Sequence, residues 1–108
     1  MLNIMFFSDG DDEGRLEIIG KLDVNSAKDM EKAIASAMEK CKNITIDMKK
    51  LEYVSSTGLR VLQQGYLWAK AKGGKFKLKN VNENVNSILE TTGMTRFIEV
   101  IEGNISND

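Results

Sequence analysis

The amino-acid sequence predicts a single α/β domain, in which a mixed sheet of four or five strands has helices packed against it. Segments with strand character and segments with helical periodicity alternate along the chain in the order β-β-α-β-α-β-α-β. Helical segments separate the later strands, which is the connection that parallel strands require. At 108 residues the chain is long enough for one hydrophobic core. We therefore expect one domain over residues 1–108, with a core over 1–102 and a frayed polar tail over 103–108.

The first two strands are predicted at Leu2–Phe7 and Arg15–Leu22, joined by an acidic turn at Asp9–Gly14. Both segments contain β-branched and aromatic residues, and the glycine-containing turn favours an antiparallel hairpin with a longer loop. The spaced acidic residues of the turn resemble a calcium loop. The twelfth position counted from Asp9 is Gly20, however, where such a loop requires a bidentate glutamate. We therefore expect a solvated turn and no metal site.

A first helix is predicted after Asn25 or Ser26, because either residue can cap a helix start. Apolar residues then recur at helical spacing and give this helix one buried face, made of Ala27, Met30, Ile34, Ala37, Met38 and Cys41. The β-rich segment Ile44–Met48 follows as a short strand near the middle of the sheet. Cys41 is the only cysteine of the chain, so it cannot form an internal disulfide, and we expect it to be buried.

A second helix is predicted to begin at Ser56 or Thr57 and to end at Lys72–Gly74. Its apolar arc is wide, and it comprises Leu59, Val61, Leu62, Gly65, Tyr66, Trp68 and Ala69. Gly58 and Gly65 lie within this arc. Because a missing side chain lets a helix approach a sheet closely, we expect both glycines to lie against the sheet.

The last third of the chain predicts a strand, a helix and a final strand. Lys75–Lys79 alternates apolar and basic residues at the strand period. Asn82 can cap the third helix and Gly93 can end it, and Phe97–Ile101 is the last predicted strand. The lysines at positions 70, 72, 75, 77 and 79 form a local basic patch. No aromatic residues interleave with them for stacking on bases, so we interpret them as protection of an edge strand and expect no nucleic-acid partner.

Composition excludes several classes of function. The chain has 15 Lys and Arg against 16 Asp and Glu, so no global field favours nucleic acid. It has no histidine, no CxxC pair and no glycine-rich phosphate loop, which removes the usual routes to nucleophilic, metal and phosphoryl-transfer catalysis. We expect no enzyme and no cofactor. The apolar N-terminus lacks the basic start of a signal peptide, and no apolar run approaches the length of a membrane span, so a cytoplasmic protein is expected.

The segment Ser55-Ser56-Thr57-Gly58 places consecutive hydroxyls at a predicted helix start, directly after a strand and a turn. Unpaired backbone N–H groups and the positive end of the helix dipole both favour an anion at such a position. The local pattern by itself is typical of simple capping. Capping does not exclude a phosphate on one of the hydroxyls, because such a phosphate would lie beside these donors. This pattern indicates a regulatory switch rather than a catalyst.

Four motifs lie along nearly the whole chain. The first is Gly20-Lys21-Leu22-Asp23, followed by Ala27, and the second runs from Ile46-Asp47-Met48 through Tyr53-Val54-Ser55-Ser56-Thr57-Gly58-Leu59. The other two are Gly73-Gly74 and Thr92-Gly93-Met94. With these motifs the chain resembles the STAS domain family, named for sulfate transporters and anti-sigma factor antagonists. The first motif is similar to the segment that enters the family's first helix, and the second to its strand, turn and phosphorylation motif. The resemblance is strongest to the free-standing bacterial anti-sigma factor antagonists.

This resemblance implies a function and a site. Ser56 matches the serine that is phosphorylated by the partner, an anti-sigma factor that is also a serine kinase of the GHKL type. A phosphatase of the PP2C type is implied as well. Asp23, Ser55, Ser56, Thr57 and Gly58 are the implied partner-binding residues, and Asp47 matches a second acidic position near the site. Ser55 departs from the family pattern, because the best-known members have Asp there.

Two functions therefore remain open at this point. In the first, the unphosphorylated protein binds its anti-sigma factor, frees a sigma factor and is switched off by phosphorylation of Ser56. In the second, the chain is an interaction or scaffold subunit of a transporter or another signalling complex, and Ser56 and Thr57 only cap the helix. Ser55 in place of Asp keeps this second function open.

Overall fold

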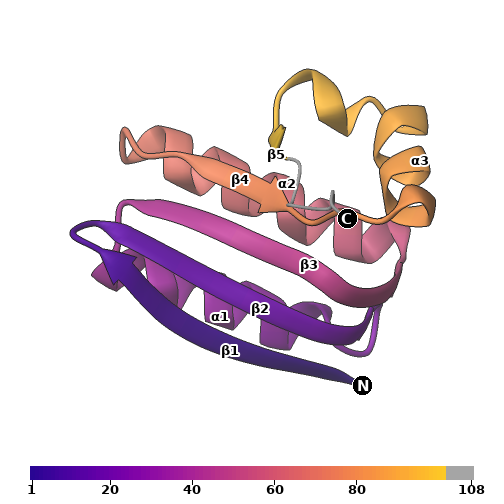
Figure 1. Ribbon diagram of the computed structural model, residues 1–108, viewed down its shortest axis with the longest axis horizontal. Helices are drawn as coiled ribbons and strands as arrows, with labels where there is room; N and C mark the ends of the chain where they lie inside the picture. Colours follow the sequence, from indigo (N-terminus) through magenta and orange to yellow (C-terminus); the bar gives the residue numbers. More distant parts are fainter. Residues whose placement is uncertain (102–108) are drawn as a thin grey trace, which may run out of the picture.

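The strands and helices follow the predicted order in the computed structural model, which describes residues 1–101 (Figure 1). The predicted tail at 103–108 lies outside the described residues. No helix within 1–101 combines the length and the apolar character needed to cross a membrane. The elements are β1 (Leu2–Gly10), β2 (Glu13–Leu22), α1 (Ala27–Lys40), β3 (Asn43–Val54), α2 (Ser56–Ala71), β4 (Phe76–Lys79), α3 (Glu83–Thr91), the 3₁₀ helix η1 (Met94–Arg96) and β5 (Glu99–Ile101).

One five-stranded mixed sheet organises the domain, with the strand order β1-β2-β3-β4-β5. The pair β1 and β2 is antiparallel, and every later pair is parallel. Helices α1 and α2 pack against the same face of the sheet, and α3 lies beyond the end of β3 (Figure 1). The opposite face carries no helix in the part of the chain that is described. The predicted α/β domain with a mixed sheet and packed helices is confirmed, with β3 at the centre.

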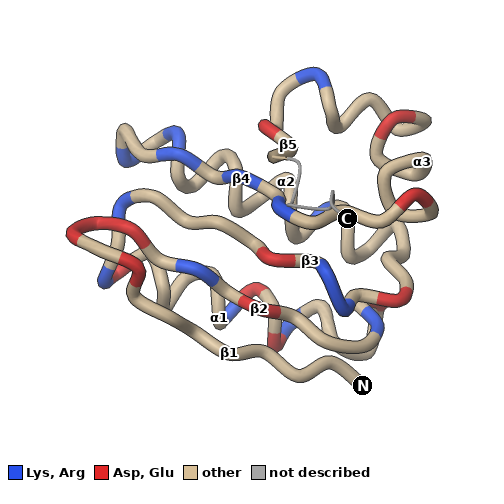
Figure 2. The backbone as a smooth tube through the Cα atoms, in the orientation of Figure 1, with Lys and Arg blue, Asp and Glu red and all other residues tan. Residues whose placement is uncertain are grey.

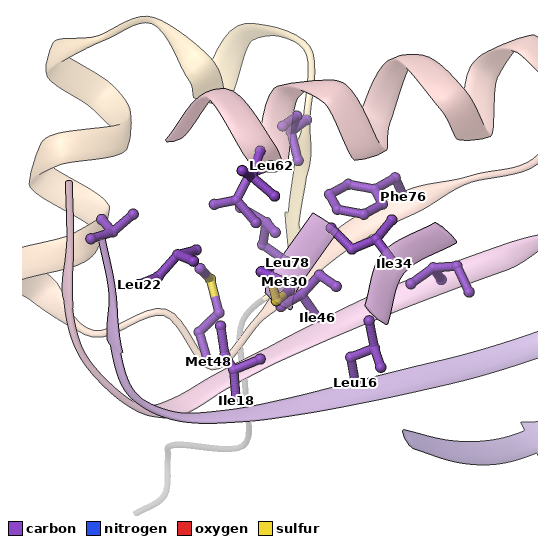
Figure 3. Close-up of a cluster of buried hydrophobic side chains, with 14 of the residues drawn as sticks. Leu16, Ile18, Leu22, Met30, Ile34, Ile46, Met48, Leu62, Phe76 and Leu78 are labelled. Carbon is purple, nitrogen blue, oxygen red and sulfur yellow. The ribbon is translucent and has the colours of Figure 1, made fainter. Parts of the chain in front are cut away.

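The core lies between the central strands and the two helices. Alternate residues of each strand point toward the helices, as in Ile44, Ile46 and Met48 of β3, which are at most 1% exposed. Met30 of α1 and Leu62 of α2 meet them from the other side and are completely buried (Figure 3). Each fully buried side chain of this size contributes roughly 1.5 to 3 kcal/mol. The predicted inner faces of both helices are therefore confirmed.

Strand β3 is much longer than predicted, since it runs to Val54 rather than ending at Met48. Its pairing with β2 contains two register shifts, and at each of them β3 has one more residue than β2. Such bulges interrupt the alternation of a strand and re-aim the side chains that follow. Lys49 and Lys50 are exposed, whereas Leu51 and Val54 return to the core at 2% exposure. The predicted end of this strand at Met48 was wrong, because Lys49 and Lys50 interrupt the alternation of apolar residues by which the strand was recognised.

The turn between β1 and β2 is shorter than the predicted loop Asp9–Gly14. Only Asp11 and Asp12 stand between the strands, and Asp12 adopts a left-handed conformation with φ of 60°. Close to the turn, Arg15 of β2 donates to Asp9 of β1 at 2.9 Å and also pairs with Glu17. This hydrogen bond from Arg15 lowers the pKa of the Asp9 carboxyl. The predicted antiparallel hairpin is confirmed, but not its longer loop.

Strand β4 is an inner strand, so the interpretation of its lysines as edge protection was wrong. β5 pairs with β4 in parallel and places Glu99 beside Lys77. β5 itself begins at Glu99 rather than at the predicted Phe97, because the chain first forms the 3₁₀ turn Met94–Arg96. The Phe97 ring instead lies 5.3 Å from the ring of Tyr66.

Candidate functional site

The start of α2 is held directly against the end of β2. Val54, the last residue of β3, pairs with Leu22, and the backbone N–H of Ser55 donates to the Leu22 carbonyl at 2.9 Å. The Ser55 hydroxyl then accepts a hydrogen bond from the N–H of Gly58 at 3.2 Å. Ser55 is therefore the N-cap of α2, and the hydroxyl of Ser56 does not have this role.

Ser56 and Thr57 lie in the first turn of α2, at its electropositive end. Ser56 is exposed, whereas Thr57 is half-buried. No acidic residue occurs in this turn, and Arg60 is exposed one turn further along the helix. The ion pairs found within residues 1–101 all involve Arg15, so Arg60 has no acidic partner there. Sequence analysis missed Arg60, although its spacing of four residues from Ser56 is a detectable signal.

Gly58 permits the close contact between helix and strand. A Cβ atom at this position would lie 2.7 Å from the Leu22 carbonyl oxygen and 2.9 Å from Cγ2 of Val54. A Cβ atom at Gly65 would likewise lie 2.7 Å from the ring of Phe76. Both distances are far below van der Waals contact, so the predicted close approach of these two glycines to the sheet is confirmed.

Asp23 follows Leu22 and lies in the loop next to the start of α2. Its carboxylate accepts a hydrogen bond from the N–H of Asn25 at 3.0 Å. The buried Ser26 hydroxyl accepts from the N–H of Asp23 at 3.0 Å and donates to the carbonyl of Lys21 at 2.8 Å. The Ser26 side chain thus binds the loop and does not cap α1. Asp23 is held in a fixed position beside the residues of the α2 start.

Two exposed apolar side chains flank this region, and sequence analysis did not identify them. Val24 is 70% exposed in the loop after β2, and Tyr53 is 49% exposed near the end of β3. Tyr53 pairs with Lys21, which places it one residue from the contact between Val54 and Leu22. We call the surface formed by the accessible groups the Ser56 surface, and it comprises Asp23, Val24, Tyr53, Ser55, Ser56, Thr57 and Arg60. Gly58, which the resemblance also implied as a partner-binding residue, is buried beneath it.

Asp47, which the resemblance placed near this site, lies elsewhere. It is in the middle of β3, seven residues before Val54, which corresponds to roughly 20 Å along a strand. Its carboxylate accepts hydrogen bonds from Asn80 at 2.9 Å and from the N–H of Lys49 at 3.1 Å. With these neighbours it lines a separate cavity of about 800 Å³. The structure therefore brings Asp23 and the α2 start together and leaves Asp47 outside.

Replacing Ser55 tests its role as the cap of α2. We expect Ser55→Ala to lower the free energy of unfolding by about 1 kcal/mol, because the N–H of Gly58 loses its acceptor. Ser55→Asp retains the acceptor and should be at least as stable as the wild type. Chemical denaturation measures these differences. Ser87→Ala, at an exposed position inside α3, is the matched control. Equal losses in Ser55→Ala and Ser87→Ala would contradict the capping role.

The fold and the site together define a small α/β domain that presents an exposed serine at a helix start, beside a structured loop. The family model of the STAS domain matches residues 10–107 of the chain. The protein therefore belongs to the STAS domain family, and the resemblance found in the sequence is confirmed.

The relatives of this chain include anti-sigma factor antagonists. The chain is 29% identical over 86 residues to the anti-sigma-B factor antagonist of Bacillus subtilis (strain 168), which covers 80% of this chain and 79% of that protein. The fold of this chain is similar to that of the anti-sigma factor antagonist SpoIIAA in its unphosphorylated form. The TM-score is 0.81 at 14% identity, and the match covers 94% of this chain and 89% of that chain. For the phosphorylated form of the Bacillus cell fate determinant SpoIIAA, the TM-score is 0.75 at 13% identity, with coverage of 94% and 92%.

Proposed function

We propose that this protein is an anti-sigma factor antagonist that is switched by phosphorylation of Ser56. In its unphosphorylated form it binds an anti-sigma factor through the Ser56 surface and thereby frees a sigma factor. The observation that carries this proposal is the exposed hydroxyl of Ser56 in the first turn of α2, where Ser55 already provides the cap. The names of the relatives support the same role.

The physical basis of the switch is a change of charge at a position that tolerates it. A phosphate on Ser56 would add a charge of about −1.5 to −2. The helix dipole and the free backbone N–H groups of the first turn favour this anion, and Arg60 lies one helical turn away. The domain can therefore carry the phosphate without unfolding. The Ser56 surface, in which Asp23 and Arg60 carry one charge of each sign, would nevertheless change from nearly neutral to a net charge of about −1.5 to −2.

The exposed apolar residues of the surface explain how the unphosphorylated form would bind. Val24, two residues after Leu22, and Tyr53, the neighbour of Val54, offer an exposed aliphatic and an exposed aromatic side chain close to the contact between β2 and α2. Residues of this kind, and aromatic residues above all, often provide most of the binding energy of an interface. Desolvating a phosphate on Ser56 in the same interface would oppose that binding. In this proposal Val24 and Tyr53 provide binding energy, and the phosphorylation state of Ser56 determines whether the anti-sigma factor binds.

The proposal assigns partners of defined chemistry. The anti-sigma factor is itself a serine kinase of the GHKL type, and a phosphatase of the PP2C type restores the active form. The protein acts by binding and is a substrate of its kinase, not an enzyme. Its place is the cytoplasm, where sigma factors meet RNA polymerase.

Phosphate transfer tests this proposal directly. We expect incubation with candidate anti-sigma kinases and ATP to add one phosphate, which intact mass spectrometry detects and peptide mapping localises to Ser56. Ser56→Ala should remain unmodified. Thr57→Ala, at the neighbouring half-buried hydroxyl, is the matched control and should be modified like the wild type. Labelling of Thr57 instead would contradict Ser56 as the phosphorylated residue. Co-purification with a transporter and no phosphate would favour the scaffold function.

A further inference from the structure

Strand β1 forms one edge of the sheet and lacks the features that usually protect such an edge. It is nine residues long, whereas β5 at the other edge has three residues and begins with Glu99. Proteins commonly protect edge strands by shortness, proline, charged residues or bulges. Leu2–Ser8 contains neither a proline nor a charged residue, and the only irregularity of β1 lies beyond Ser8. In Figure 2, β1 is uncharged along most of its length as far as the acidic turn.

Both faces of β1 present apolar side chains next to this free edge. On the open face of the sheet, Met5 is 43% and Phe7 is 37% exposed. On the face toward α1, Ile4 and Phe6 are half-buried and line a groove of about 200 Å³ between β1 and α1. A strand paired with β1 would cover apolar side chains on both faces, which favours association in water.

The backbone groups at this edge are unpaired and regularly spaced. The N–H of Lys21 donates to the carbonyl of Met1 at 3.3 Å, so Met1 and Lys21 are a hydrogen-bonded pair of the antiparallel ladder. Because such pairs alternate along an antiparallel ladder, the N–H and C=O groups of Leu2, Ile4 and Phe6 point away from β2. Among the described residues, β1 pairs on one side only. The edge is therefore ready to accept another strand.

We propose that β1 pairs with β1 of a second copy of this protein, antiparallel about a two-fold axis through Met5. In this register Ile4 of one copy lies opposite Phe6 of the other, and their outward-pointing backbone groups form hydrogen bonds. Met5 lies opposite Met5. Pairing over Leu2–Ser8 would form roughly eight backbone hydrogen bonds. The two sheets then join into one continuous sheet.

The chemistry of the edge favours a second copy over a different protein. In this register the uncharged stretch Leu2–Ser8 of one copy pairs along its full length with the same stretch of the other copy. The two acidic turns, Asp11–Asp12 of each copy, lie at opposite ends of the interface. Like charges therefore do not meet, and the net charge of −1 adds little repulsion between copies. A two-fold symmetric dimer is also the commonest assembly of identical chains.

Sedimentation velocity over a wide range of protein concentration tests this dimer. We expect the wild type to dimerise and Met5→Lys to dimerise about a hundredfold more weakly, because two ammonium groups would face each other at the two-fold axis. Leu67→Lys is the matched control, since Leu67 is 48% exposed on α2, away from the edge, and this variant should behave like the wild type. A wild type that stays monomeric up to millimolar concentration would refute the dimer.

A charge-swap experiment separates loss of pairing from loss of folding. Met5→Lys and Met5→Glu should each be largely monomeric, and an equimolar mixture of them should dimerise again through opposite charges. Amide hydrogen exchange of the wild type should slow at Ile4 and Phe6 as concentration rises. Dimers that are unaffected by both Met5 variants, or protection of these amides only by a different protein, would overturn the proposal.

Discussion

Phosphorylation of Ser56 is expected to weaken binding to the anti-sigma factor more than a hundredfold, which corresponds to roughly 3 kcal/mol. The phosphate would place about two negative charges on the exposed first turn of α2, and this charge would have to be desolvated in a close complex. Ser56→Asp, with a single charge, should weaken binding by a smaller factor. Ser56→Ala should bind like the unphosphorylated wild type. Isothermal titration calorimetry measures all four affinities.

A control must show that the loss of affinity depends on the position of the added charge and not on the charge alone. Ser87→Asp adds the same carboxylate at an exposed position of α3 and is the matched control, with an affinity expected to equal that of the wild type. Thermal unfolding of the phosphorylated protein supplies a second check, because the helix dipole and Arg60 should leave its stability unchanged or slightly raised. Equal affinities for Ser56→Ala, Ser56→Asp and the phosphorylated protein would exclude Ser56 as the switch.

Gly58→Ala is expected to lower the free energy of unfolding by about 2 to 3 kcal/mol, in spite of the higher helix propensity of alanine. The new methyl group would meet the Leu22 carbonyl oxygen at 2.7 Å and Cγ of Leu22 at 2.8 Å. A backbone oxygen cannot turn aside as the end of a long side chain can. The first turn of α2 must therefore move away from β2, and the hydrogen bond from Ser55 to Leu22 weakens. Urea denaturation measures the loss.

A control on the same helix isolates the contribution of this contact. Gln63 is exposed on α2, and Gln63→Ala should change stability by less than about 0.5 kcal/mol. Gly58→Ala should also weaken partner binding, since it displaces Ser56 relative to Asp23. A Gly58→Ala protein that is as stable as Gln63→Ala would mean that the helix start does not depend on close contact with β2.

The sequence predicted the order of the elements well because the chain uses strong local signals. Asn82 caps α3 by accepting from the N–H of Val85 at 2.8 Å, and Gly93 adopts the left-handed conformation with φ of 81°. The end of β3 was not predictable in this way. Its last six residues depend on bulges opposite β2, and a bulge is a property of the pairing rather than of either strand alone.

The candidate site shows the same division between local and non-local information. A helix start at Ser56 was predictable from the chain, whereas the assignment of the cap to Ser55 depends on a single hydrogen bond at 3.2 Å. Val24 and Tyr53 were missed because an exposed apolar residue has no periodic pattern. Their proximity to α2 arises from the pairing of β2 with β3, which connects segments about thirty residues apart in sequence.

In the proposed switch the two adjacent serines have separate roles, and that separation has an evolutionary consequence. Ser55 holds the helix, so any small residue with a side-chain acceptor suits position 55. Ser56 does not provide this capping bond, so its replacement leaves the cap of α2 in place. If Ser56 is the switch as proposed, a lineage could thus lose the regulation by one mutation at position 56, and regain it by reversion, without passing through a misfolded intermediate.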